Sequence, residues 1–157
     1  MEAIVVGCAL VIHKGKILIA QRLSNSLFEP NKWEFPGGKL KDSETIQDCI
    51  RRELTEELGI QVETLDFYDV YRHTYTSPKK RLVELHVYKT DFSGGPIQLL
   101  DAQDAKWVNS KQITNYSFVE GDIAIVEKIL KDWNILIQKN KSSNSEDKTN
   151  TNRYEDD

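Results

Sequence analysis

Residues 44–59 read Glu-Thr-Ile-Gln-Asp-Cys-Ile-Arg-Arg-Glu-Leu-Thr-Glu-Glu-Leu-Gly, and this stretch decides the fold. No proline or glycine interrupts it before its last residue, and apolar side chains recur at helical spacing. Gly59 then offers a residue at which a helix readily ends. The pattern predicts a helix over 44–58, whose apolar positions are Ile46, Cys49, Ile50, Leu54 and Leu58.

Three carboxylates lie on or beside the apolar face of this helix. At about 100° per residue, Glu53 and Glu57 fall inside the apolar arc and Glu56 borders it. A solvated face does not explain them, because an amphipathic helix keeps its acids on the opposite side. Magnesium is a natural counter-charge, since it is typically shared between carboxylates and substrate phosphates. The alternative is an acidic rim paired with the nearby cations Arg51, Arg52 and Lys39.

A strong backbone breaker, Pro36-Gly37-Gly38, comes shortly before this helix and predicts a tight turn. Neither glycine carries a side chain, so backbone carbonyls and amides can approach a bound ion or phosphate closely. An ordinary turn without a ligand is the alternative. The position just ahead of the acidic helix favours one shared metal and phosphate site.

The remaining sequence predicts mostly strands. Two apolar runs flank a polar turn near the start of the chain, and two later segments rich in β-branched and aromatic residues flank another, so two hairpins are expected. A short strand and an amphipathic helix follow. The expected elements are strands over 3–12, 16–20, 62–75, 82–92 and 104–108 and a helix over 123–138.

The bulk properties fit one globular domain of ordinary size, with 157 residues and a formal net charge of -4. This charge argues against a nucleic acid polymer as partner, whereas a single nucleotide remains a possible ligand. Cys8 and Cys49 lack metal-ligand spacing and are interpreted as buried free thiols. No apolar run approaches the roughly 18 residues of a membrane span, so we expect no membrane contact and a cytoplasmic setting.

The end of the chain differs in composition from the rest. Beyond residue 139 the sequence is polar and lacks aliphatic residues. Such a segment buries too little apolar surface to offset its ordering entropy. We therefore expect a folded domain over 1–139 and a disordered polar tail over 140–157.

The acidic helix is part of a longer sequence pattern that spans residues 38–60. Gly38, five residues, Glu44, seven residues and then Arg-Glu-Leu-Thr-Glu-Glu-Leu-Gly-Ile over 52–60 resemble a complete Nudix box. The flanking segments resemble the MutT-type branch of the Nudix hydrolase family over roughly residues 3–137. The resemblance implies an α/β fold, the Nudix α/β/α sandwich with a mixed β-sheet between helices. It also implies hydrolysis of a nucleoside triphosphate to monophosphate and pyrophosphate with Mg²⁺, for which Mn²⁺ is a possible substitute.

The resemblance implies roles for the residues of the box. Glu56 and Glu57 resemble the principal metal ligands, joined by a backbone carbonyl of Gly37 or Gly38. Glu53 resembles a metal-linked residue that orients or deprotonates water. Two further residues of the pattern would be supportive: the side chain that holds the glutamates in place is Arg52, and the one that holds the loop-to-helix turn is Glu44.

A further acidic ligand in this branch often lies six residues before the late tryptophan. That spacing from Trp107 reaches Asp101, where the family usually has glutamate. Because aspartate is shorter by one methylene, Asp101 is expected to bind metal through water, with Asp104 as the other candidate. A solvated loop acid is the alternative for either residue.

Substrate contacts are also implied. Arg22 and Lys39 resemble residues near the phosphates, and Glu34 and Phe35 belong to the same flanking motif. Asp122 aligns with a position where asparagine contacts the base in the MutT type, and it either bonds the base here or caps the last helix. Candidates for either the base pocket or the core are His73, His86, Trp33, Phe35 and Phe118.

The leading hypothesis for the substrate is an oxidised purine triphosphate such as 8-oxo-dGTP, which would make the protein an 8-oxo-dGTP diphosphatase. Its close rival is CTP, dCTP or 5-methyl-dCTP. A third reading, from another class, is a Nudix module that senses a nucleotide without hydrolysing it. A monomer and a homodimer are both compatible with the sequence.

Overall fold

The computed structural model describes residues 2–138. Its strands are β1 (Ala3–His13), β2 (Lys16–Gln21), β3 (Trp33–Glu34), β4 (Gly37–Lys39), β5 (Asp66–Tyr75), β6 (Arg81–Asp91) and β7 (Asp104–Val108). Its α-helices are α1 (Ile46–Leu58) and α2 (Ile123–Leu136). Two short 3-10 helices precede α2 in this part of the chain, namely η1 (Ile113–Asn115) and η2 (Glu120–Asp122).

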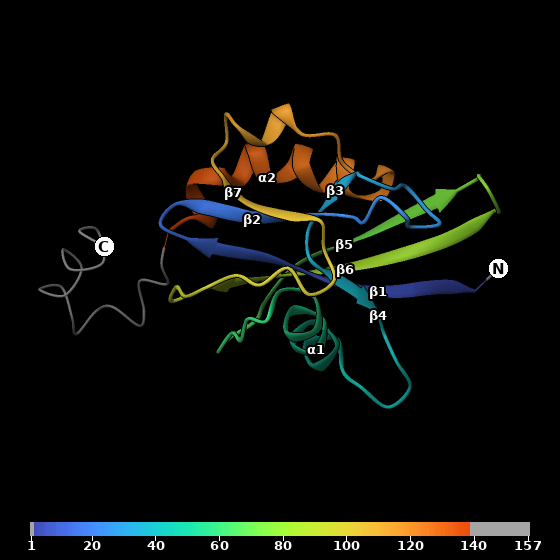
Figure 1. The fold of residues 1–157 in the computed structure, drawn as a ribbon, viewed down its shortest axis with the longest axis horizontal. Coiled ribbons are helices and arrows are strands. Elements are labelled where there is room, and N and C mark those ends of the chain that lie inside the picture. The colour runs from blue at the N-terminus through green and yellow to red at the C-terminus, as the bar shows by residue number, and fades with distance from the viewer. Residues whose placement is uncertain (1, 139–157) are drawn as a thin grey trace, which may run out of the picture.

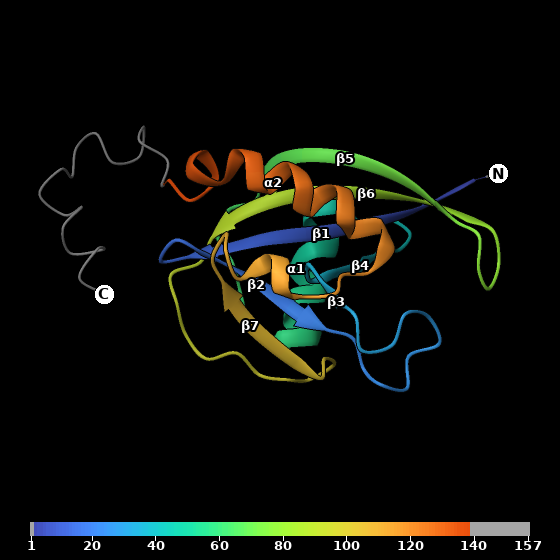
Figure 2. The ribbon, with the colours of Figure 1, turned by 90° about the horizontal axis from the view of Figure 1, so that it is seen from above.

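The strands form one mixed sheet between the two helices. Along the sheet the order is β3-β2-β1-β6-β5, with β4 also paired to β1 and β7 to β2. Strands β1 and β6 are parallel, whereas the other pairs are antiparallel. Helix α2 covers one face of the sheet and α1 the other (Figure 1), and Figure 2 shows the same arrangement from above. The predicted α/β/α sandwich with a mixed β-sheet is confirmed.

The continuous apolar run of β1 follows from its central position. Successive side chains of a strand point to opposite faces, so a strand buried on both faces is apolar throughout. Leu10 packs in the cluster beneath α2, and its neighbour Val11 packs in the cluster beneath α1. The two cores therefore share β1 and fix both helices against it.

Both predicted hairpins, the strand over 104–108 and both helices are confirmed, with shifted ends. Helix α1 begins at Ile46 rather than 44, because the hydroxyl of Thr45 caps it by accepting from the backbone N–H of Asp48 at 3.1 Å. Strand β5 begins at Asp66 rather than 62, and the carbonyl of Val62 instead accepts a hydrogen bond from Arg51. Helix α2 ends at Leu136 rather than 138.

The tight turn predicted at Pro36-Gly37-Gly38 is wrong in one respect, because the two glycines begin strand β4. Gly37 pairs with Cys8 and Gly38 with Gly7 of β1. The backbone N–H of Ala9 donates to the carbonyl of Pro36 at 2.9 Å, which continues the pairing. The segment is thus held flat between β1 and α1, where side chains would not fit.

Two other expectations concern the ends and surroundings of the chain. The predicted polar tail, 140–157, lies outside the described residues. Neither described helix is both long and apolar enough to cross a membrane.

Candidate active site

Helix α1 places its three box carboxylates at different depths. Glu57 is buried, with 7% of its surface exposed. The side chain of Glu53 is 16% exposed, whereas that of Glu56 is 53% exposed. This order confirms the helical geometry predicted from the sequence, in which the first two lie inside the apolar arc and the third at its edge.

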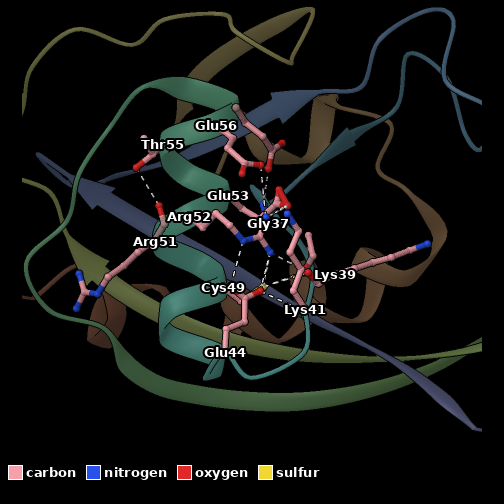
Figure 3. A network of polar contacts seen from close by, with 12 residues as sticks. Gly37, Lys39, Lys41, Glu44, Cys49, Arg51, Arg52, Glu53, Thr55 and Glu56 are labelled. Atoms are coloured by element: carbon pink, nitrogen blue, oxygen red, sulfur yellow. Dashed lines mark hydrogen bonds and ion pairs between the residues drawn. The ribbon is translucent and has the colours of Figure 1, made fainter.

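Arg52 joins the loop before α1 to two of these carboxylates, Glu53 and Glu56 (Figure 3). Its Nη2 lies 2.7 Å from Oε1 of Glu44, and its Nη1 lies 3.0 Å from Oε1 of Glu53. The same Nη1 lies 3.4 Å from Oε2 of Glu56. Hydrogen bonding from Arg52, followed by that from the backbone N–H of Lys41, lowers the pKa of Glu44 to about 2. These contacts fit the supportive roles implied for Arg52 and Glu44.

Strand β4 lies against α1 at the level of the buried acids. The backbone N–H of Gly37 donates to Oε1 of Glu57 at 3.2 Å. A Cβ on Gly38 would lie 2.4 Å from the carboxyl group of Glu53. Since real Cβ atoms do not approach so closely, glycine at this position is required for β4 and the carboxylate to meet.

These elements open onto a cleft of about 180 Å³. Strand β4 and helix α1 form its floor, loop 22–32 forms one wall, and the loop before β7 forms another. Its lining residues are Gly37, Glu53, Glu57, Asp101, Glu34, Arg22, Leu23 and Ser26. Four carboxylates and one guanidinium thus meet in one small space.

The cleft contains more acidic than basic groups, and their burial and mutual repulsion raise the pKa values of its glutamates. Burial first, and then the charges of Glu34 and Glu53, raise the pKa of Glu57 to about 9. Burial also raises the pKa of Glu53, against the lowering effect of Arg52. The pKa of Glu34 rises to about 7, because burial outweighs its pairing with Arg22. Arg22 is the only cation that lines the cleft within residues 2–138.

This donor set fits a hard divalent cation. In the described part of the chain, no group of three or more acidic, histidine or cysteine side chains is arranged to hold a metal ion by itself. Magnesium does not need one, because it keeps several waters and takes one or two carboxylates plus phosphate oxygens. Glu57 is buried, and the hydrogen bond that it accepts from Gly37 comes from a backbone amide rather than from a cation. An added positive charge would therefore relieve the repulsion within the cleft.

The structure distinguishes between several predicted metal and phosphate residues. Asp101 lines the cleft, and its backbone N–H donates to the carbonyl of Glu57 at 3.1 Å. Asp104 instead begins β7, where its Oδ1 accepts from the backbone N–H of Ala105 at 2.8 Å. Asp101 is thus the better placed of the two. Neither Glu56 nor Lys39 is among the lining residues.

On the substrate side, Arg22 and Glu34 form a pair at the wall of the cleft. Nη1 of Arg22 lies 3.2 Å from Oε1 of Glu34, and its Nε donates to the carbonyl of Phe28 at 3.0 Å. The alternative of a freely solvated cation does not describe Arg22. Its guanidinium is held toward the acids while lining the space where phosphates would enter.

Asp122 is buried and lies behind this wall. Its Oδ2 accepts from the backbone N–H of Phe35 at 3.0 Å. Its side chain makes no capping bond to α2, so the helix-cap alternative is wrong. Long-range hydrogen bonding, rather than the local helix end, determines where this carboxyl sits. Burial first, and repulsion from Glu34 and Glu29 after it, raise the pKa of Asp122 to about 8.

Most aromatic and histidine candidates for the base pocket have other partners. The rings of Phe35 and Phe118 are 5.4 Å apart in the core beneath α2, so their side chains serve packing. His86 pairs at 2.7 Å with Glu84 of its own strand, β6. Trp33 packs edge-on against Tyr116, and His73 pairs with Glu120 at 2.8 Å.

Leu23 and Ser26 line the cleft but were not predicted from the sequence. They lie in an irregular loop, where no periodicity marks which side chains face inward. The only available signal is their nearness in sequence to Arg22.

Comparison with known proteins identifies the family of the chain. The family model of the NUDIX domain matches residues 1–129. A CTP pyrophosphohydrolase from Escherichia coli (strain K12) is 29% identical over 130 residues, 83% of this chain and 93% of that protein. An 8-oxo-dGTP diphosphatase from Buchnera aphidicola is 28% identical over 128 residues, 82% of this chain and 97% of that protein.

A solved structure agrees as well. The solution structure of the E. coli ORF135 protein superposes with a TM-score of 0.71 at 29% identity, covering 84% of this chain and 91% of that chain. The chain belongs to the NUDIX family and is a Nudix hydrolase.

Proposed function

We propose that the protein hydrolyses a nucleoside triphosphate to a nucleoside monophosphate and pyrophosphate with a divalent metal ion, Mg²⁺ or in its place Mn²⁺. Nudix hydrolases are generally dependent on divalent metal. The observation that carries the proposal is the cleft of about 180 Å³, which is lined by buried Glu57 and half-buried Glu53 of α1 and by Arg22. Such a site suits a phosphate chain that arrives together with its counter-ions.

The residues divide the work between them. Glu57, Glu53 and the carbonyl of Gly37 would hold the metal, with Glu56 at the rim and Asp101 from the opposite loop. When bound, the metal neutralises phosphate oxygens and acidifies a coordinated water. Glu53, which lines the cleft, would orient the attacking water and accept its proton as a general base.

Other side chains orient the reaction without taking part in bond cleavage. Arg22 meets the phosphates, because it is the cation already held at the wall of the cleft. Arg52 keeps Glu53 at a fixed distance from β4 through its bonds to Glu44 and Glu53. Water attacks the α- or the β-phosphorus, the bond from that phosphorus to the oxygen bridging the two breaks, and the products are the monophosphate and pyrophosphate.

For the base, we favour 8-oxo-dGTP. Relatives named 8-oxo-dGTP diphosphatase support it, among them the Buchnera protein. Burial raises the pKa of the Asp122 carboxyl to about 8, so near neutral pH this group can carry a proton and can both donate and accept a hydrogen bond, as an asparagine amide does. The relative named CTP pyrophosphohydrolase favours CTP or a related pyrimidine triphosphate as the second candidate.

Product analysis tests the reaction. The purified chain is incubated with magnesium and a triphosphate, and phosphorus NMR identifies the products. Equal amounts of monophosphate and pyrophosphate are expected. Diphosphate and inorganic phosphate would contradict the proposal. Tight nucleotide binding with no product at all would instead support a non-catalytic sensor.

A further inference from the structure

Tyr75, at the end of β5, lies beneath the segment that carries Asp122. It is buried, with 9% of its surface exposed. Its hydroxyl oxygen accepts a hydrogen bond of 2.8 Å from the backbone N–H of Gly121. This bond is buried and joins segments 46 residues apart in the chain. The hydroxyl therefore holds the turn immediately before Asp122.

The turn is shaped to admit this hydroxyl. A Cβ on Gly121 would lie 2.8 Å from the hydroxyl oxygen of Tyr75 and 3.4 Å from Cδ1 of Leu85. A side chain at position 121 would therefore push the turn away from β5. Because Gly121 has no side chain, the Tyr75 hydroxyl can reach its backbone N–H.

Loop 22–32, which forms a wall of the cleft, reaches the same place. Oε2 of Glu29 accepts from the backbone N–H of Glu120 at 2.7 Å. The guanidinium of Arg81 lies 4.4 Å from the ring centroid of Phe28 and 4.4 Å from that of Tyr75. Tyr75 thus lies where β5, the wall loop and the turn before α2 meet.

We propose that Tyr75 is a positioning residue for base selection, acting by holding Asp122 against the backbone N–H of Phe35. The inference rests on the proposed function, in which Asp122 meets the base. Oδ2 of Asp122 receives the Phe35 N–H at 3.0 Å. The direction in which its other oxygen, Oδ1, points depends on how firmly the turn over 120–122 is held. Loss of the Tyr75 hydroxyl leaves a buried N–H at Gly121 unpaired and loosens that turn.

The size of the effect follows from the hydrogen bond. A buried neutral bond contributes about 0.5–1.5 kcal/mol, which corresponds to a change of about two- to tenfold in an equilibrium or rate ratio. A site that reads a base by hydrogen bonds loses discrimination when its polar groups are misplaced. We therefore expect the ratio of kcat/KM between the best and the poorest base to fall about two- to tenfold in Tyr75→Phe.

The test compares Tyr75→Phe with Tyr71→Phe on a panel of triphosphates that differ only in the base. Tyr71 lies on the same strand, and its hydroxyl is also buried but is not bonded to the turn before α2, so it is a matched control. We expect the ratio of kcat/KM between the best and the poorest base to fall in Tyr75→Phe and to stay unchanged in Tyr71→Phe. A merely structural defect would lower kcat/KM for every base by the same factor, and this result would overturn the inference.

Gly121→Ala provides a second, independent arm. Its added methyl meets the hydroxyl in the wild type but not in Tyr75→Phe, so the two substitutions should be non-additive in base preference. Additive effects would overturn the inference. Hydrolysis without any base preference in the wild type would overturn it while leaving the reaction in place. A wild type that hydrolyses no triphosphate would contradict the proposed function itself and, with it, the inference.

Discussion

The guanidinium of Arg52 lies 2.7 Å from Glu44 and 3.0 Å from Glu53, so a single side chain ties the loop after β4 to the candidate general base. Glu44 in turn accepts from the backbone N–H of Lys41 at 2.8 Å. The carboxylate that would activate water is thus held from one side by an ion pair and approached from the other by Gly38. Its position is therefore fixed by Arg52 of its own helix, which Glu44 anchors, and by strand β4.

Arg52→Lys should lower kcat by about 10- to 100-fold, the usual range for loss of a residue that orients a metal-site ligand. A lysine ammonium cannot span both carboxylates as the planar guanidinium does. The control is Arg51→Lys, since Arg51 donates instead to the backbone carbonyls of Val62 and Glu63. Equal loss of activity in the two variants, measured by steady-state kinetics, would show that Arg52 has no special role.

Glu53→Gln should reduce turnover by about 10²- to 10⁴-fold, as expected for loss of a general base, while the fold stays intact. The substitution keeps the side-chain volume and removes the charge. Glu63→Gln serves as the control, because Glu63 is exposed and outside the cleft. Activity near that of the wild type in Glu53→Gln would contradict the role assigned to this residue.

Glu44→Gln should destabilise the protein in a pH-dependent way. The pKa of Glu44 is lowered from its ordinary 4.5 to about 2 by hydrogen bonds from Arg52 and Lys41. Its contribution to stability is therefore fully present above about pH 4.5 and is lost as the pH falls toward about 2. Urea unfolding should show a clear difference between wild type and variant near neutral pH that shrinks as the pH falls through this window. A difference independent of pH would refute the ion-pair account of Glu44.

Glu57→Gln should stabilise the metal-free protein at alkaline pH and weaken its binding of magnesium. Because the folded-state pKa of Glu57 is raised from 4.5 to about 9, its contribution to stability is lost as the pH rises between these values. In chelator at a pH of about 8 the variant should therefore melt above the wild type. Magnesium should raise the Tm of the wild type, which binds it when folded, and leave the variant nearly unchanged. Equal magnesium shifts would remove Glu57 from the metal site.

The helix of the site could be predicted from the sequence because its evidence is local. The 3.6-residue period of α1 shows both where Glu57 points and that its position is unusual for an acid. Pairing of β4 with β1 could not be predicted in this way, because glycine is disfavoured in strands. What places Gly37 and Gly38 in the sheet is the space between β1 and α1, a tertiary feature.

The wall of the cleft was harder to foresee. Loop 22–32 has no periodicity, so the inward direction of Leu23 and Ser26 depends on distant anchors such as the bond from Glu120 to Glu29. The contact made by Asp122 could not be predicted from the local sequence either. Its place before α2 is compatible with a helix cap, but its carboxyl accepts a hydrogen bond from the backbone N–H of Phe35 and makes no capping bond. Both features come from contacts between residues far apart in the sequence.

The most direct test of the central claim is pyrophosphate release across 8-oxo-dGTP, dGTP, CTP, dCTP and 5-methyl-dCTP at matched concentrations, with and without a chelator. We expect release that requires a divalent metal and is fastest for one base, with 8-oxo-dGTP favoured. Release that persists in the chelator, or no release from any of the five nucleotides with magnesium present, would contradict it.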